Sequence, residues 1–154
     1  MKEKLLHFIW KLKLFSSNKL VGTQNETIHI ISSGQENLGS GPDFLNSKIE
    51  INRQLWAGNI EIHVNSFDWY EHNHQTDENY DSVILHVVWN HDVEVHRKSN
   101  QPITTLELKN YISKDLLKNY EQLFSKNRHW INCEKDINKV DSFIFKNWIE
   151  RLFF

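Results

Sequence analysis

The chain has 154 residues, a net charge of −2 and a pI near 6.5, and 39% of its residues are hydrophobic. This size suits one domain with its own core, and the near-neutral charge excludes a broad basic surface that binds polyanions non-specifically. No apolar run approaches the roughly 20 residues of a membrane-spanning helix, so we expect no membrane contact. A single cysteine, Cys133, excludes an intrachain disulfide and favours a reducing, cytoplasmic location.

The first predicted element is an amphipathic helix over residues 3–15, where apolar side chains recur at helical spacing. Residues 26–32 alternate and are rich in β-branched side chains, which predicts a strand. A Gly- and Ser-rich loop follows at 33–42. The stretches 44–51 and 55–64 predict two strands of a hairpin with a short turn between them.

The middle of the chain predicts a polar connection followed by a buried strand. Residues 66–82 are polar and do not alternate, so we expect a loop running into a short helix, with Asp68 as its N-cap. Residues 82–89 are almost wholly apolar, which indicates a central strand covered on both faces. The stretches 93–98 and 103–109 predict a second hairpin.

Two more predicted helices, over 112–125 and 140–154, complete a mixed α/β fold. We place a core domain at 1–110 and a helical extension, interpreted as incomplete, at 111–154. The apolar side chains of 140–154 cover more than one narrow stripe. We therefore expect a missing C-terminal region or a partner to pack on residues 140–154, with packing back on the core as the alternative.

One long segment carries a resemblance to a known family. Residues 41–89 read "GPDFLNSKIEINRQLWAGNIEIHVNSFDWYEHNHQTDENYDSVILHVVW". This segment resembles the hallmark of an uncharacterised bacterial family, domain of unknown function 2851, and the similarity continues through "ITTLELK", "CE" and the final helix. The resemblance implies a partial member whose relatives continue past this point, and it implies no activity.

Within that segment, Asp43, Glu61 and His63 form a candidate site. Asp43 lies nine residues before the turn residue Asn52 and Glu61 lies nine after it, so an antiparallel hairpin places them roughly opposite each other. Glu61 and His63 share one face of their strand because side chains alternate with a period of two. Two carboxylates and an imidazole in one place can hold Mg²⁺ or Mn²⁺ and position a water for attack on phosphorus.

These residues also resemble the motif of the PD-(D/E)XK phosphodiesterase superfamily. Pro42 and Asp43 stand for its Pro-Asp pair, Glu61 for its second acid, and His63 occupies the position of its lysine. The resemblance implies a restriction-endonuclease-like αβββαβ core, here with an added β-hairpin and C-terminal helices. It also implies metal ligation by Asp43 and Glu61, with His63 as the base or water-orienting group, in hydrolysis of nucleic acid. His63 departs from the motif because a neutral imidazole is no standing positive charge.

A second group of polar residues lies in the connection before the buried strand. We interpret His74 and Asp77 as auxiliary residues that could contact phosphate or hold a second metal. His72 is interpreted as an exposed loop histidine, and His86 as a hydrogen-bonded histidine of the core. No familiar zinc spacing is present.

Other interpretations stay open at this stage. Glu107 and Lys109 repeat the acid-x-Lys pattern, but we interpret them as the solvated face of a strand. One alternative function is a non-catalytic binding or assembly module that keeps the fold with a degenerate site. Another is a His-rich metal-binding or glycoside-processing enzyme, because paired acids also perform acid/base chemistry on sugars.

Overall fold

The computed structural model describes residues 2–124 and 136–153, and Cys133 lies outside them. Contacts divide the chain into two compact units, Met1–Ser113 and Lys114–Phe154. The predicted boundary after residue 110 stays a prediction. No helix in the described part of the chain is long and apolar enough to cross a membrane.

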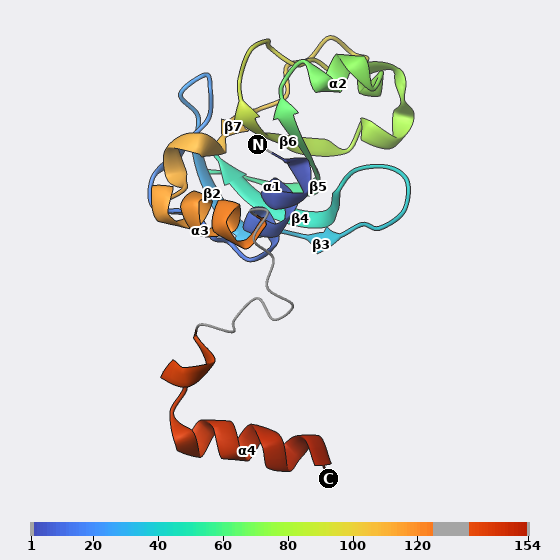
Figure 1. Cartoon of the computed structure of the whole chain (residues 1–154). Coiled ribbons are helices and arrows are strands. Elements are labelled where there is room, and N and C mark those ends of the chain that lie inside the picture. The colour runs from blue at the N-terminus through green and yellow to red at the C-terminus, as the bar shows by residue number, and fades with distance from the viewer. Residues whose placement is uncertain (1, 125–135, 154) are drawn as a thin grey trace. The chain divides into compact units, whose positions relative to one another are not determined.

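The first unit is built on one mixed sheet of seven strands with the order β1-β2-β4-β5-β6-β7, in which β3 pairs with β4 (Figure 1). The strands from β1 to β5 pair antiparallel, whereas β6 pairs parallel with both β5 and β7. Together with the helices this is a mixed α/β arrangement, as predicted. The strands span Leu20–Val21, Thr27–Ser32, Gln35–Glu36, Phe44–Ile51, Gln54–Asn65, Val83–Asn90 and Thr105–Glu107 in the order β1 to β7.

Helix α1, Glu3–Lys11, packs against β5. Its buried side chains recur one and four residues apart, so they form the single apolar face that a surface helix needs: these are Leu5, Leu6, Ile9 and Trp10. The helix ends before the predicted residue 15 because Lys13 takes a left-handed φ of 51°, which stops the helical path.

The hairpin of β4 and β5 is present as predicted. Its turn residues Asn52 and Arg53 have φ values of 51° and 65°, the left-handed pair that suits a two-residue hairpin turn. Near the start of β4, between Phe44 and Ser47, its register against β5 shifts by one residue. Asn46 supplies this bulge with a φ of 57°. The shift brings Phe44 opposite Ile60, so the residue before Phe44 comes level with Glu61.

Strand β6 is the central strand that the apolar run predicted. Leu85 and Val87 are fully buried, and Ile84 is 8% exposed. The strand lies between β5 and β7, so its apolar residues leave no open edge. Gly58 allows the close approach of β5, because a Cβ there would lie 2.5 Å from the Ile84 side chain.

The connection from β5 to β6 contains helix α2 and two short 3₁₀ turns, η1 and η2. These elements span Asp68–Glu71, His74–Thr76 and Glu78–Tyr80. Trp69 and Tyr80 are buried in one cluster with Val83 and two other apolar residues, and this packing holds the connection in place. The predicted N-cap is wrong: Asp68 is the first residue of α2, and its carboxylate accepts the N–H of Asn65 instead.

The predicted second hairpin is present only as a short antiparallel contact between residues 95–97 and 101–103. Residues 93–98 form no strand and make one isolated bridge, between His96 and Pro102. Residues Thr105–Glu107 form β7, which pairs parallel with β6. Val95 joins the buried cluster around Trp69, so the alternation in this stretch reflects side-chain packing under a loop.

A 3₁₀ turn, η3 at Leu108–Tyr111, ends the first unit. The second unit contains α3, Lys114–Phe124, then the 3₁₀ turn η4, Ile137–Lys139, and α4, Ser142–Phe153. Both helices lie within the predicted ranges. Several large apolar side chains of α4 are 41–82% exposed, namely Phe143, Ile144, Phe145, Trp148, Ile149 and Leu152. The predicted attachment of another segment to residues 140–154 stays a prediction.

Candidate metal centre

Asp43 and Glu61 meet where β4 begins beside β5. The backbone N–H of Asp43 donates to Oε2 of Glu61 at 3.1 Å. The carboxylate of Asp43 in turn accepts the N–H of Ile62 through Oδ2 at 2.9 Å. These reciprocal contacts depend on the bulge at Asn46, because it brings Asp43 level with Glu61.

The second oxygen of Glu61 faces two histidines. Its Oε1 lies 3.5 Å from Nε2 of His63 and 3.3 Å from Nε2 of His74. His63 arrives two residues along β5, and His74 is the first residue of η1. One carboxylate therefore connects Asp43 on one side with two imidazoles on the other.

His63 lies at the middle of a group of imidazoles. Its Nδ1 is 2.8 Å from Nε2 of His86, which lies beside Glu61 on β6, and its Nε2 is 3.1 Å from Nδ1 of His72. One ring nitrogen each from His63, His72 and His74 lies within 4.8 Å of the others. Imidazole nitrogens this close could hold a metal ion.

His7 adds a further imidazole from α1. Its Nε2 lies 3.4 Å from Oδ2 of Asp43 and 4.0 Å from Oε1 of Glu3. Burial alone would lower the pKa of His7, but hydrogen bonding and charge from Asp43, with Glu3 and Glu61, outweigh it and raise the pKa. The surroundings of His7 therefore favour its protonated form beside Asp43.

The environment of Glu61 disfavours its ionised form. The side chain is 6% exposed, and burial, followed by the charge of Asp43, raises its pKa to about 8. Without a cation, Glu61 therefore carries its proton at neutral pH. A bound cation would stabilise the ionised carboxylate against both burial and the charge of Asp43, and would therefore lower the pKa of Glu61.

The inner histidines are neutral. Burial, with the neighbouring imidazoles, lowers the pKa of His63 to about 2 and that of His86 to about 3. Burial also lowers the pKa of His74, against the opposing charges of Asp43 and Asp77. Neutral imidazoles keep a lone pair available to a metal at physiological pH.

Of the predicted residues, Asp43, Glu61, His63 and His74 are joined by successive contacts. The carboxylate of Asp77 accepts the N–H of Asn79 at the start of η2, and its charge acts on His74. The inner part of the site is closed to solvent, because Glu61 and His63 are 5% and 1% exposed. The outer side is more open, because the side chains of Asp43 and His7 are each 21% exposed.

Sequence reasoning missed His7, and it interpreted His72 as an exposed loop histidine and His86 as a hydrogen-bonded histidine of the core. His72 is exposed, as expected, yet its Nδ1 contacts His63. His86 is the hydrogen-bonded core histidine that was expected. Nothing in the sequence links residue 7 to residue 43, so only the packing of α1 against the sheet reveals His7.

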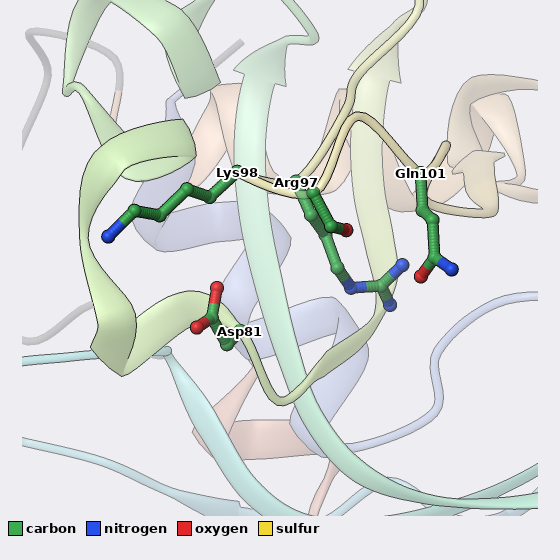
Figure 2. Close-up of a pocket in the computed structure, with 5 residues that line it drawn as sticks. Asp81, Arg97, Lys98 and Gln101 are labelled. Atoms are coloured by element: carbon green, nitrogen blue, oxygen red, sulfur yellow. The ribbon is translucent and has the colours of Figure 1, made fainter.

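Two other polar groups lie outside this centre. Glu107 accepts the N–H of His91 at 2.9 Å and pairs with Lys109 at 2.7 Å, so it serves a local contact. A shallow pocket is lined by Ser99 and by the four labelled side chains in Figure 2, Asp81, Arg97, Lys98 and Gln101. None of the residues predicted for the site lines this pocket.

Comparisons with known proteins give one match. The family model described as "Protein of unknown function (DUF2851)" matches residues 3–154. No curated protein and no solved structure was found to match the chain.

Proposed function

The chain belongs to the DUF2851 family, and we propose that it is a metal-dependent phosphodiesterase that hydrolyses nucleic acid at Asp43 and Glu61. One observation carries this proposal: the carboxylates of Asp43 and Glu61 meet beside a group of imidazoles, and burial, followed by the charge of Asp43, raises the pKa of Glu61. Two adjacent carboxylates are suited to a divalent metal, because a cation offsets their mutual repulsion.

The order and direction of the strands support the proposal. A helix, three antiparallel strands, a connection with a short helix, and a strand parallel to the third follow in sequence as α1, β2-β4-β5, α2 and β6. This order agrees with the restriction-endonuclease-like αβββαβ core that the PD-(D/E)XK resemblance implies. In it, Asp43 directly precedes the second of these three strands and Glu61 lies on the third. The likeness is one of fold and motif and does not fix the reaction.

The chain's residues would divide the work as follows. Asp43 and Glu61 would hold a divalent cation, which when bound supplies an activated water and stabilises charge on the phosphate. His63 is buried and its pKa is lowered to about 2, so it would orient the ionised Glu61 and would not itself take a proton. His7 would supply, beside Asp43, the positive charge that the lysine position lacks.

Access to the site favours the side of Asp43. The side chains of Asp43 and His7 are each 21% exposed, whereas those of Glu61 and His63 are 6% and 2% exposed. A phosphodiester would therefore approach past Asp43 and His7. Because the chain has no broad excess of positive charge, we expect recognition of a limited stretch of nucleic acid.

The test is a cleavage assay on labelled single- and double-stranded DNA and RNA with Mg²⁺ or Mn²⁺. We expect cleavage by the wild type and a loss of at least roughly 100-fold in Asp43→Asn and Glu61→Gln, because each removes charge stabilisation at the reacting phosphate. Glu50→Gln, on β4 outside the site, is the matched control.

The alternative of a non-catalytic module is favoured by the burial of Glu61 and His63. It makes a different prediction for the same assay. Metal binding that depends on Asp43, without cleavage of any of the four substrates, would replace the hydrolase with a binding module. Cleavage that survives Asp43→Asn would contradict the assignment of the site.

A further inference from the structure

We propose that His63, His72 and His74, together with Oε1 of Glu61, form a four-coordinate site for a transition-metal ion of the Zn²⁺ class. This inference goes beyond the proposed hydrolysis at Asp43, and it does not require that reaction. Three imidazoles are a poor set for Mg²⁺, which prefers oxygen ligands, but they suit Zn²⁺ and its neighbours.

The spacing of the donor atoms fits a small tetrahedral ion. Two ligands that each lie 2.0–2.1 Å from a tetrahedral Zn²⁺ are separated by roughly 3.3 Å. Three pairs of donors lie at such separations. Oε1 of Glu61 is 3.5 Å from Nε2 of His63 and 3.3 Å from Nε2 of His74, and Nε2 of His63 is 3.1 Å from Nδ1 of His72.

Hydrogen bonding within the group leaves one ring nitrogen of His74 without a partner. Its side chain is 10% exposed, and its Nε2 has no hydrogen-bond partner among the described residues, although Glu61 is 3.3 Å away. A buried ring nitrogen without a partner is costly. A metal ion within bonding distance would accept the lone pair of this nitrogen and so give it a partner.

The surroundings hold the imidazoles in place. The ring of His74 stacks on Tyr80 with centroids 3.7 Å apart, and Trp69 meets it edge-on at 5.3 Å. His63 can donate its Nδ1–H to Nε2 of His86 at 2.8 Å, which leaves its Nε2 lone pair free. A ligating histidine commonly donates its other nitrogen in this way, because the bond fixes tautomer and ring orientation.

Charge also supports the assignment. With Glu61 ionised, three neutral imidazoles and one carboxylate leave a divalent ion with a net charge of +1. Asp43, whose backbone N–H binds the other oxygen of Glu61, lies close enough to offset that charge. Glu61 thus presents Oε1 to the imidazoles and Oε2 toward Asp43, so it separates this site from the one proposed for hydrolysis.

The ion would connect the sheet to the segment that crosses over it. Glu61 and His63 belong to β5, whereas His72 and His74 belong to the connection between β5 and β6. Binding would therefore hold this connection against β5. We expect the melting temperature of the full chain to rise with Zn²⁺, since a ligand that binds only the folded state stabilises it.

The test uses the full chain, stripped of metal and titrated with Zn²⁺ or Co²⁺. We expect one ion per chain and the intense visible absorption of four-coordinate Co²⁺. His72→Ala should weaken Zn²⁺ by more than the roughly 10- to 100-fold typical for loss of a residue that only orients a ligand. His72 is exposed, so this variant should fold, and far-ultraviolet circular dichroism checks it. His29→Ala, an exposed histidine on β2, is the matched control.

A second variant tests ligation itself. His72→Cys, made in a Cys133→Ser background, replaces an imidazole with a thiolate that also binds Zn²⁺. We expect Zn²⁺ affinity to recover relative to His72→Ala, with a new thiolate-to-Co²⁺ charge-transfer band. Asp43→Asn should retain the site, so failed cleavage and failed Zn²⁺ binding are separate results. Weak six-coordinate Co²⁺ absorption, or equal Zn²⁺ affinity in wild type and His72→Ala, would overturn the inference.

Discussion

The N–H of Asp43 donates to Oε2 of Glu61 at 3.1 Å, so one acid of the site fixes the other through its backbone. The side chain of Asp43 meanwhile accepts the N–H of Ile62, the neighbour of Glu61. The two carboxylates therefore stay together whether or not a cation binds. Their proximity has consequences for stability that can be measured without any substrate.

The first prediction concerns stability at alkaline pH. Because the pKa of Glu61 rises from 4.5 to about 8, the metal-free folded state keeps a proton that the unfolded state has lost. The free energy of unfolding should then fall by about 1.4 kcal/mol per pH unit between pH 6.5 and 8, and level off above 8. Urea unfolding in the presence of a chelator measures this slope. Glu61→Gln should flatten it, with Glu50→Gln as the control; an unchanged slope in Glu61→Gln would contradict the prediction.

The second prediction concerns acid. His63 and His86 have pKa values of about 2 and 3 in the folded protein, against an ordinary value of 6.5. Below pH 6.5 the unfolded chain therefore binds protons at these histidines while the folded chain does not. The free energy of unfolding falls as the pH is lowered through this range. His86→Leu removes one of these groups, so the loss per pH unit should shrink by about 1.4 kcal/mol. Identical slopes for wild type and His86→Leu between pH 5 and 6.5 would show that His86 is not held neutral.

The third prediction concerns the bulge of β4. Asn46 has a φ of 57°, and its side chain is exposed, so its replacement tests the backbone more than the packing. Asn46→Ala should cost about 1 kcal/mol, because an alanine pays for a left-handed conformation that asparagine tolerates. Asn46→Gly should cost less, since glycine adopts positive φ freely. Equal losses for the two variants in urea unfolding would mean that the conformation of Asn46 is not what matters.

The fourth prediction concerns the contact of β5 with β6. A Cβ at Gly58 would lie 2.5 Å from both the Ile84 side chain and the backbone oxygen of Ser82. The backbone oxygen cannot move aside as a flexible side chain could, so Gly58→Ala should destabilise by at least about 2 kcal/mol. Gly39→Ala, where a Cβ comes no closer than 3.3 Å to an Asn37 side chain, is the control. Thermal unfolding of the two variants should separate them clearly.

Short-range patterns explain why some of the fold was predictable. The alternation of 44–51 and 55–64 specified the hairpin, and the apolar run through Leu85 specified a buried strand. The same rule failed at 93–98, because a period of two reports which side chains are buried and not which strand they pair with. Val95 is buried in the cluster around Trp69. The strand that pairs with β6 is β7, and residues 93–98 do not take part in that pairing.

The residues of the site were likewise predictable only where a short-range pattern relates them. Asp43, Glu61 and His63 could be grouped because a hairpin and a strand period relate them at short range. His7 and His72 reach the group through tertiary packing, and no spacing in the sequence encodes that. The burial of Glu61 was also beyond sequence reasoning, since it depends on how α1 and the connection after β5 cover the sheet.

The parallel pairing of β5 with β6 sets an order of assembly. A hairpin closes in microseconds because its partners are neighbours in sequence, whereas a parallel pair must first close the whole connection between its strands. Asp43 and Glu61 belong to the hairpin, while His72 and His74 belong to that connection. We therefore expect a newly made chain to bring Asp43, Glu61 and His63 together first and to add the imidazoles of His72 and His74 last, so that a hard cation can bind before a softer one is enclosed.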